Sequence, residues 1–199
     1  MKYKFFDNNE NKLIIFFNGW GMDDKIVSHL DMTGYDLVIL YDYNDLELTL
    51  PTLKKYEQTF VVGWSMGVMI STLFDFEGKR IAINGTPKSV DNDFGIPERV
   101  YKLTIRGFSE ESCEKFMQRM FDKKPPIEKF STRDFSSQKQ ELIALLEVQG
   151  KEVEFDKIIV SDNDLIIPTK NQLAYWKNAE IIKSGHCPFF EYQSWEQIL

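Results

Sequence analysis

The stretch VVGWSMGVMI, residues 61–70, ends a β-forming run in two glycines that flank Ser65. It matches the G-x-S-x-G pattern of a nucleophile elbow, in which a sharp strand-to-helix turn lifts a serine hydroxyl above a sheet. Such a turn brings backbone segments close together, so small residues are required two positions either side of the serine. The following helix has a dipole that favours negative charge at its amino end. We therefore expect Ser65 to be a nucleophile rather than part of a glycine-rich turn.

The strand before Ser65 is one of seven short β-forming runs. They cover residues 2–6, 12–17, 35–40, 59–63, 79–84, 156–161 and 179–184. Most are almost continuously hydrophobic, which is typical of strands covered on both faces, as in a parallel sheet. Helical patterns follow three of them, at residues 22–30, 65–76 and 167–178. This alternation predicts an α/β protein with a doubly wound, mostly parallel sheet.

Residues from about 86 to 156 interrupt this alternation, because they contain no convincing strand and are polar, charged and helical in composition. Residues 108–121 are expected to form a helix with Ser109 as its N-cap. A second helix is expected over residues 132–150, closed by Gly150. We interpret the segment as a helical lid near the carboxyl edge of the sheet, within a single domain.

The composition is globular, with 43% hydrophobic and 28% charged residues. The formal net charge of −7 disfavours non-specific binding to nucleic acid or to an anionic membrane surface. No apolar run is long enough for a membrane span, and the amino terminus does not resemble a signal peptide. Cys113 and Cys187 are too few for a disulfide framework or a zinc site, so no metal or cofactor is expected. The sequence thus predicts a soluble cytoplasmic protein.

A serine nucleophile needs a base to take its proton, and the chain has two histidines. His29 lies in a helical pattern ahead of Ser65, where we expect it to pack or to face solvent. His186 lies in SGHCPFF, just after the last predicted strand. In α/β-hydrolases the nucleophile, the acid and the histidine follow one another in that order along the chain, and only His186 fits. We interpret His186 as the base rather than as an ordinary loop histidine.

The acid that orients the imidazole should follow the penultimate strand, where SDNDLIIP offers Asp162 and Asp164. Asp162 directly follows the strand and could instead cap the loop through its side chain. Asp164 precedes LIIP, whose proline can begin the next helix. We expect Asp164 to be the acid and keep Asp162 as the alternative.

An oxyanion hole needs two backbone N–H groups. Met66, the residue after the nucleophile, is expected to supply one, and the loop after an early strand the other. In FFNGWGMDD, residues 16–24, two glycines bracket Trp20. We expect the N–H of Trp20 to be the second donor and its indole to form a wall of the acyl pocket. The alternative is a glycine-rich turn beside a core tryptophan.

These motifs follow one another as NGWGMDD, GWSMG, INGTP with GIP shortly after it, DLIIP and GHCPFF. In this order they resemble the α/β-hydrolases and, more narrowly, the pimeloyl-[acyl-carrier-protein] methyl ester esterases of biotin synthesis in their compact, short-lid branch. The resemblance covers essentially the whole chain. It implies an enzyme that removes the methyl group masking the pimeloyl carboxylate once chain extension on the carrier protein is complete.

The resemblance also implies roles for single residues. Ser65, Asp164 and His186 become the triad, and Trp20 and Met66 supply the oxyanion hole. Asn18 stands where many hydrolases have a histidine before the glycine, but that histidine is not a triad member.

A triad does not identify the scissile bond, so a general short-chain esterase or a thioesterase remains an alternative. A non-catalytic binding protein with a hydrolase fold is less favoured, because no triad member is missing.

An acyl carrier protein is strongly acidic, as is this chain, so carrier binding requires a local basic patch. The expected lid offers Arg99, Lys102, Arg106, Lys115, Arg119, Lys123, Lys124, Lys129 and Arg133. Lys115 and Arg119 are four apart, on one helical face. We expect Arg106, Lys115 and Arg119 to dock the carrier protein. The alternative is a solvated surface of mixed charge, which the glutamates within residues 110–114 favour.

Overall fold

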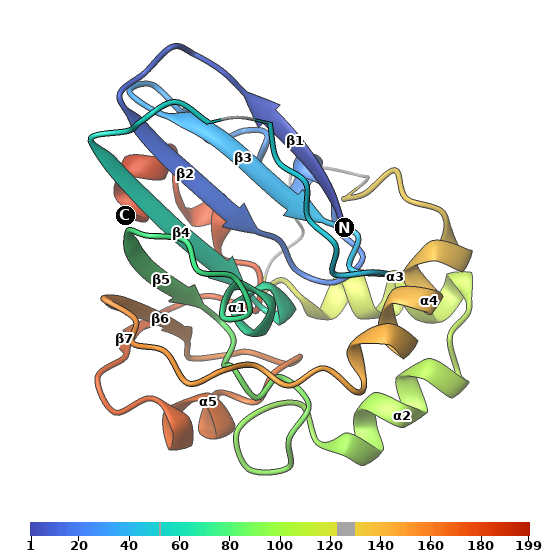
Figure 1. The fold of residues 1–199 in the computed structure, drawn as a ribbon. Helices are drawn as coiled ribbons and strands as arrows, with labels where there is room; N and C mark the ends of the chain where they lie inside the picture. The colour runs from blue at the N-terminus through green and yellow to red at the C-terminus, as the bar shows by residue number, and fades with distance from the viewer. Residues whose placement is uncertain (52, 123–129) are drawn as a thin grey trace.

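The computed structural model describes residues 1–51, 53–122 and 130–199. Lys123, Lys124 and Lys129 of the expected basic patch lie outside them. Seven strands of the described residues form one sheet, as the sequence predicts (Figure 1). They are β1 (Lys2–Phe6), β2 (Lys12–Phe17), β3 (Asp36–Tyr41), β4 (Gln58–Trp64), β5 (Lys79–Ile83), β6 (Lys157–Ser161) and β7 (Glu180–Ile182). Their order in the sheet is β1-β3-β2-β4-β5-β6-β7, and β1 alone among them runs antiparallel to its neighbour.

The central strands are buried on both faces, which explains their continuous hydrophobicity. Alternate residues of β2 enter different cores: Ile14 and Phe16 belong to one cluster, and Leu13, Ile15 and Phe17 to the other. The first cluster includes Phe189 and Trp195 near the carboxyl terminus. The second includes residues of the helix that follows Ser65 and of the helices inserted between β5 and β6.

The helix expected over residues 22–30 is wrong, since the structure has only a 3-10 turn over Asp24–Val27. The chain then pairs with the carboxyl-terminal segment instead of continuing a helix, because the N–H of Asp31 donates to the carbonyl of Gln193 at 2.9 Å. His29 packs there as expected, with its ring stacked on Phe190 at a centroid distance of 4.5 Å.

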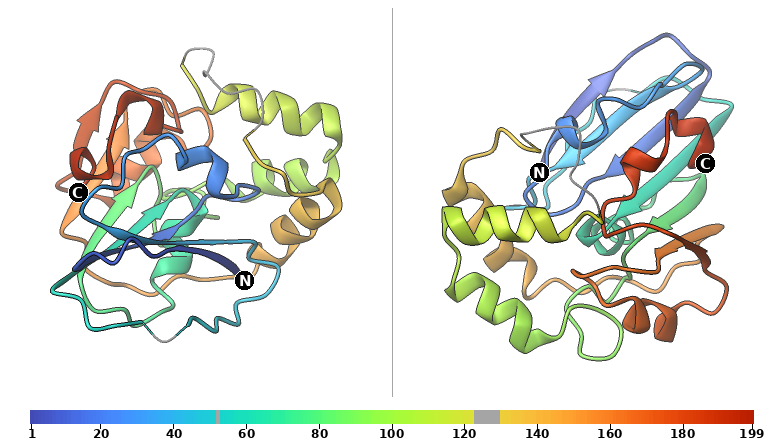
Figure 2. Two further views of the ribbon diagram at one scale, coloured as in Figure 1. Left: turned by 90° about the horizontal axis from the view of Figure 1, so that it is seen from above. Right: turned by 180° about the vertical axis from the view of Figure 1, so that it is seen from behind.

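The helices α1 (Met66–Ser71) and α5 (Thr169–Tyr175) follow β4 and β6, inside the ranges that the sequence predicts. Three further helices lie between β5 and β6: α2 (Glu98–Arg106), α3 (Glu110–Arg119) and α4 (Phe135–Leu145). They gather beyond the carboxyl ends of the central strands (Figures 1 and 2). This is the place expected for the lid. The bounds of the lid at about 86–156, and the assignment of the chain to a single domain, stay predictions. No helix of the described residues is long and apolar enough to cross a membrane.

The lid helices differ from the expected ones in two respects. The helix α2 was not identified in the sequence, although Pro97 precedes its first residue and Gly107 follows its last. The prediction that Gly150 closes the next helix is wrong, because α4 ends at Leu145. Gly150 instead permits a close backbone approach: a Cβ on it would lie 2.4 Å from the carbonyl oxygen of Pro87. Ser109 does cap α3, accepting a hydrogen bond from the N–H of Ser112.

Candidate active site

Ser65 occupies the turn between β4 and α1 with φ 57° and ψ −126°, which is a strained backbone conformation for a residue with a side chain. The turn is held because the N–H of Ser65 donates to the carbonyl of Ile83 at 3.0 Å. A Cβ on Gly63 would lie 2.6 Å from the Cα of Val68, and a Cβ on Gly67 would lie 2.0 Å from the carbonyl oxygen of Phe17. Both glycines are therefore required by close backbone contacts, as the elbow pattern indicates.

A continuous chain of hydrogen bonds connects the three side chains expected to form a triad. The Oγ of Ser65 lies 2.8 Å from Nε2 of His186, and Nδ1 of His186 lies 2.8 Å from Oδ2 of Asp164. All three residues are buried. Asp162, the alternative acid, is exposed at its side chain, while its N–H donates to the carbonyl of Ile182. The structure thus brings Ser65, His186 and Asp164 together and leaves Asp162 outside.

The carboxylate of Asp164 is fully engaged. Its Oδ1 accepts the N–H groups of Ile166 and Ile167 at 2.8 and 2.9 Å, and its Oδ2 accepts Nε2 of Gln172 at 2.8 Å beside His186. These contacts fix the position of the carboxylate, as is required of an acid that orients an imidazole. Gln172, on α5, is a site residue that the sequence reasoning missed.

The loop that carries His186 is fixed by its backbone carbonyl, which accepts Nε1 of Trp64 at 2.8 Å and Nδ2 of Asn84 at 2.9 Å. Asn84 follows β5 at a positive φ of 45° and also accepts the N–H of Ser161 at 2.7 Å. It therefore ties the ends of two neighbouring strands to the histidine loop. Asn84 was also missed, although it lies in the INGTP motif as the last residue of the strand predicted over 79–84.

Trp20 and Met66, the expected oxyanion donors, line one pocket together with Ser65. Within the part of the chain that the structure describes, neither of their backbone N–H groups has a hydrogen-bond acceptor. Among the described residues, the pocket at Ser65 is therefore lined by two residues whose N–H groups lack a partner, and two such donors are what a tetrahedral intermediate with a negative oxygen requires.

The pocket at Ser65 is mainly apolar. Its other walls come from Ile96, Val100, Tyr101, Thr104, Phe116, Arg119, Leu142, Leu165 and Ile166. The indole of Trp20 packs edge-on against Phe116, with a centroid distance of 4.9 Å. Among the described residues that line the pocket, Arg119 alone is charged. A lining of this kind suits a hydrocarbon chain with a polar group near its outer end.

The residues expected to dock a carrier protein lie at different places on the lid. Arg119, on α3, is exposed and lines the pocket. Arg106, at the end of α2, is exposed and lines a neighbouring groove. Lys115 forms an exposed ion pair with Glu111 at 2.6 Å. Lys115 and Arg119 thus lie one turn apart on α3, Arg106 lies on α2, and the charge of Lys115 is partly neutralised by its ion pair.

The cysteines do not compete with Ser65 as nucleophiles. Burial raises the pKa of Cys113 to about 11, and burial also raises the pKa of Cys187. Both therefore stay protonated near neutral pH, where a thiol is a poor nucleophile. In the described ranges, no group of three or more His, Cys, Asp or Glu side chains is arranged to hold a metal ion.

Comparison with known proteins adds one family and three relatives. A family model described as "Pimeloyl-ACP methyl esterase BioG" matches residues 1–198. The crystal structure of SeMet-BioG from Haemophilus influenzae superposes with a TM-score of 0.91 at 32% identity, covering 100% of this chain and 99% of that one. A malonyl-[acyl-carrier protein] O-methyltransferase of Bacteroides fragilis is 33% identical over 82% of this chain, which spans only 36% of that protein. An esterase from Exiguobacterium antarcticum has a TM-score of 0.71 at 16% identity, covering 95% of this chain and 89% of that one, and so shares the fold.

Gly67→Ala tests the close contact at the elbow. The new Cβ would lie 2.0 Å from one backbone oxygen and 2.5 Å from another, those of Phe17 and Asn18, which cannot move aside as a side chain could. Overpacking costs about 1–3 kcal/mol, which lowers the melting temperature of a chain of this length by about 2–12 °C. Thermal unfolding followed by circular dichroism measures the change.

Gly107→Ala is the milder comparison, because a Cβ there would lie 3.3 Å from its nearest neighbour, the carbonyl oxygen of Leu103, a contact that a shift of a few tenths of an ångström relieves. We expect it to melt within about 2 °C of the wild type. Equal melting temperatures for both variants would contradict the contact at Gly67.

Proposed function

The chain belongs to the pimeloyl-ACP methyl esterase BioG family, and we propose that Ser65, His186 and Asp164 perform its ester hydrolysis. The protein is a carboxylic ester hydrolase of the α/β-hydrolase fold that demethylates pimeloyl-[acyl-carrier protein] methyl ester in biotin synthesis. The observation that carries the residue assignment is the hydrogen-bonded chain from Ser65 Oγ to Asp164, in a pocket with two backbone N–H groups that have no acceptor among the described residues.

In the first half of the reaction, Oγ of Ser65 attacks the carbonyl carbon of the methyl ester while its proton passes to Nε2 of His186. Asp164 accepts the hydrogen bond from Nδ1–H and stabilises the imidazolium. The carbonyl oxygen becomes an oxyanion that accepts the N–H groups of Trp20 and Met66. Collapse of this intermediate breaks the bond to the methoxy oxygen, which takes the proton from Nε2 and leaves as methanol.

In the second half, water attacks the acyl-enzyme and gives its proton to Nε2 of His186. A second tetrahedral intermediate forms in the same oxyanion hole. Its collapse returns the proton to Oγ of Ser65 and releases the carboxylic acid. Atoms and charges thus balance as ester plus water giving methanol and an acid.

The apolar pocket supports the proposal that the pimeloyl chain lies between Ser65 and the lid. A groove between α2 and α3 shares Trp20, Val100, Thr104, Phe116 and Arg119 with this pocket. We therefore propose that the acyl chain reaches Ser65 along this groove, with its carrier-bound end at the lid surface. Because α2 and α3 line both the pocket and the groove, we propose that these two helices contact the carrier protein.

The exposed face of α2 supports this docking surface further. Val100 and Leu103 are 51% and 54% exposed, and Arg99, Lys102 and Arg106 lie beside them on the same helix. Apolar side chains among cations suit an acidic partner. Opposite charges speed the association of the two proteins, and burial of the apolar side chains stabilises the complex. Lys102 is paired with Glu98, so we propose Arg106 and Arg119 as the main docking cations and give Lys115 a smaller part. The cytoplasmic location, and the absence of nucleic-acid and membrane binding, stay predictions from the composition.

Ser65→Ala, Asp164→Asn and Asp162→Asn test the triad by hydrolysis of the methyl ester. We expect Ser65→Ala to lower kcat by about 10⁴–10⁶. Asp164→Asn should lower it by about 10⁴, because the imidazole then adopts the wrong tautomer. Asp162→Asn is the matched control and should keep wild-type activity, since its side chain is exposed. Near-normal turnover by a folded Ser65→Ala or Asp164→Asn protein would contradict the assignment.

Arg106→Glu tests the docking surface with two substrates, the carrier-bound methyl ester and a small soluble ester. We expect kcat/KM to fall about tenfold on the carrier-bound ester, equivalent to about 1.4 kcal/mol. The soluble ester should be unaffected, because Arg106 does not line the pocket at Ser65. Raising the salt concentration should reduce the difference between wild type and variant, because exposed charges are screened.

Lys79→Glu is the control, since it reverses a charge at the amino end of β5, opposite the lid. It should leave both substrates unchanged. If Arg106→Glu has no effect on the carrier-bound ester, or impairs both esters equally, the docking role of α2 is wrong.

A further inference from the structure

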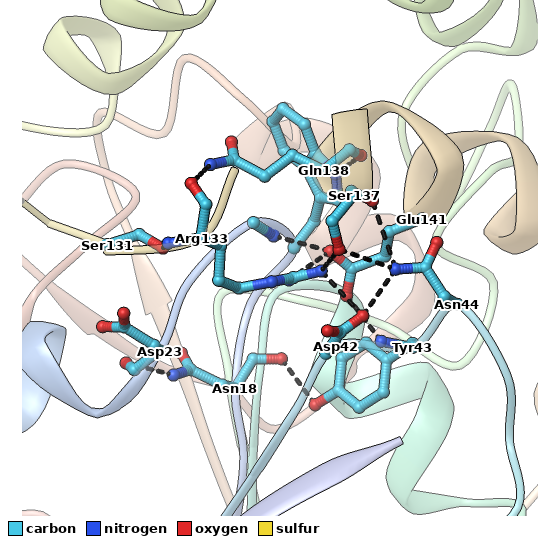
Figure 3. Close-up of polar contacts among 12 residues, drawn as sticks. Asn18, Asp23, Asp42, Tyr43, Asn44, Ser131, Arg133, Ser137, Gln138 and Glu141 are labelled. Atoms are coloured by element: carbon cyan, nitrogen blue, oxygen red, sulfur yellow. Dashed lines mark hydrogen bonds and ion pairs between the residues drawn. The ribbon is translucent and has the colours of Figure 1, made fainter. Parts of the chain in front are cut away.

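The side chain of Glu141, on α4, connects the lid to two loops at the carboxyl edge of the sheet. Its Oε2 accepts the N–H of Gly21 at 3.0 Å, and its Oε1 accepts the N–H of Tyr43 at 2.8 Å. The residue is 0% exposed. Gly21 belongs to the loop after β2, and Tyr43 belongs to the loop after β3. Figure 3 shows Tyr43 beside Glu141. A single lid carboxylate therefore fixes the backbone of two loops that are distant in sequence.

The negative charge of Glu141 is balanced by a row of ion pairs (Figure 3). Nη1 of Arg133 lies 2.6 Å from Oε2 of Glu141, and Nη2 of Arg133 lies 2.9 Å from Oδ1 of Asp42. Lys2 pairs with the other oxygen of Asp42 at 2.8 Å. Burial raises the pKa of Glu141, and the Arg133 charge opposes that shift. Buried ion pairs add little net stability compared with a hydrophobic alternative, so the geometry they fix is the more informative feature.

The loop after β2 is held on both sides of the N–H of Trp20. Before it, the N–H of Gly19 donates to Oδ1 of Asn18 at 2.9 Å. After it, the N–H of Gly21 is bound by Glu141. The indole Nε1 of Trp20 donates to the carbonyl of Gln138, also on α4, at 2.8 Å. Every neighbouring N–H thus has a partner, whereas the Trp20 N–H at the pocket has none among the described residues.

We propose that Glu141, supported by Arg133 and Asp42, is a positioning residue for the oxyanion hole. It fixes the peptide group that follows Trp20, while Asn18 fixes the one before Gly19, so the peptide between them is held and its Trp20 N–H is directed toward the carbonyl oxygen that becomes the oxyanion. This inference rests on the proposed function, because it takes the Trp20 N–H as an oxyanion donor. It follows that the oxyanion hole is complete only while α4 is packed against the loop after β2, which makes the lid a part of the catalytic apparatus.

Glu141→Gln tests the proposal, because it keeps the size of the side chain but turns one acceptor oxygen into an amide donor. That donor would face a backbone N–H or Arg133, and the loop would shift. With a soluble ester, we expect kcat to fall about 10- to 100-fold, somewhat less than the loss of a whole oxyanion donor. KM should change by no more than about twofold, because the contact acts on the transition state.

A trifluoromethyl ketone of the same acyl length provides a readout that a general structural defect would not produce. Oγ of Ser65 adds to its carbonyl carbon, the proton passes to His186, and the carbonyl oxygen becomes an oxyanion in the hole. The affinity of Glu141→Gln for this ketone should fall by the same factor as kcat/KM. The affinity for the corresponding secondary alcohol, which forms no oxyanion, should stay at the wild-type value.

Glu147→Gln is the matched control, since Glu147 is exposed just beyond the end of α4, and it should behave as the wild type. If circular dichroism shows that Glu141→Gln does not fold, Arg133→Lys is used in its place. This variant keeps the Glu141 carboxylate but cannot contact Glu141 and Asp42 with two guanidinium nitrogens at once. We expect kcat and the affinity for the ketone to fall by equal factors, and by less than in Glu141→Gln. A folded variant with wild-type kcat and ketone affinity overturns the proposal, as does equal weakening of ketone and alcohol. A wild-type protein that binds no ketone would instead contradict the proposed function.

Discussion

The candidate site depends on how closely α1 approaches the end of β2. The Cα of Gly67 lies so near the carbonyl of Phe17 that no side chain fits between them. Phe17 is the last residue of β2, and the loop that follows it carries Trp20. One backbone contact therefore sets the position of Ser65 and the distance between the Met66 and Trp20 N–H groups. The positive φ of Ser65 is the local cost of this approach, and the hydrogen bond to Ile83 helps to hold it.

Around this contact, buried polar side chains define the loops at the carboxyl edge of the sheet. Asn84 joins the ends of β5 and β6 to the loop of His186, and Asp164 closes its own loop through two backbone N–H groups. A buried polar group without a partner costs about 1–3 kcal/mol, so each of these networks selects one loop conformation over others. Glu141 extends the same principle from the sheet to the lid, because its partners lie on both.

The sequence was sufficient for the seven strands and for the residues that the structure joins at Ser65, because both produce local signals. Buried parallel strands are continuous apolar runs, and an elbow needs glycines at fixed spacing. Glu141 gives no such signal: a glutamate in a polar helical segment is usually solvated, and its contact with Gly21 spans 120 residues. The helix α2 is a different case. Its apolar residues do fall on one helical face, so its sequence carried a periodic signal that was overlooked.

The three lid helices are therefore under different constraints. The inner face of α4 is tightly packed, with Glu141, Leu142 and Leu145 at most 2% exposed, and the loop that carries Trp20 depends on it. In α2, Tyr101 alone among its residues is fully buried, Val100 and Thr104 line the pocket at Ser65, and the cations on the outer side are exposed. A change at the exposed cations of α2 would alter the outer surface of the lid, whereas a change on the inner face of α4 would alter the loop that carries Trp20. Under the proposed function, the exposed cations of α2 serve recognition of the carrier and the inner face of α4 supports the chemistry. The outer side of α2 can then vary without disturbing Ser65, whereas its pocket-lining residues cannot.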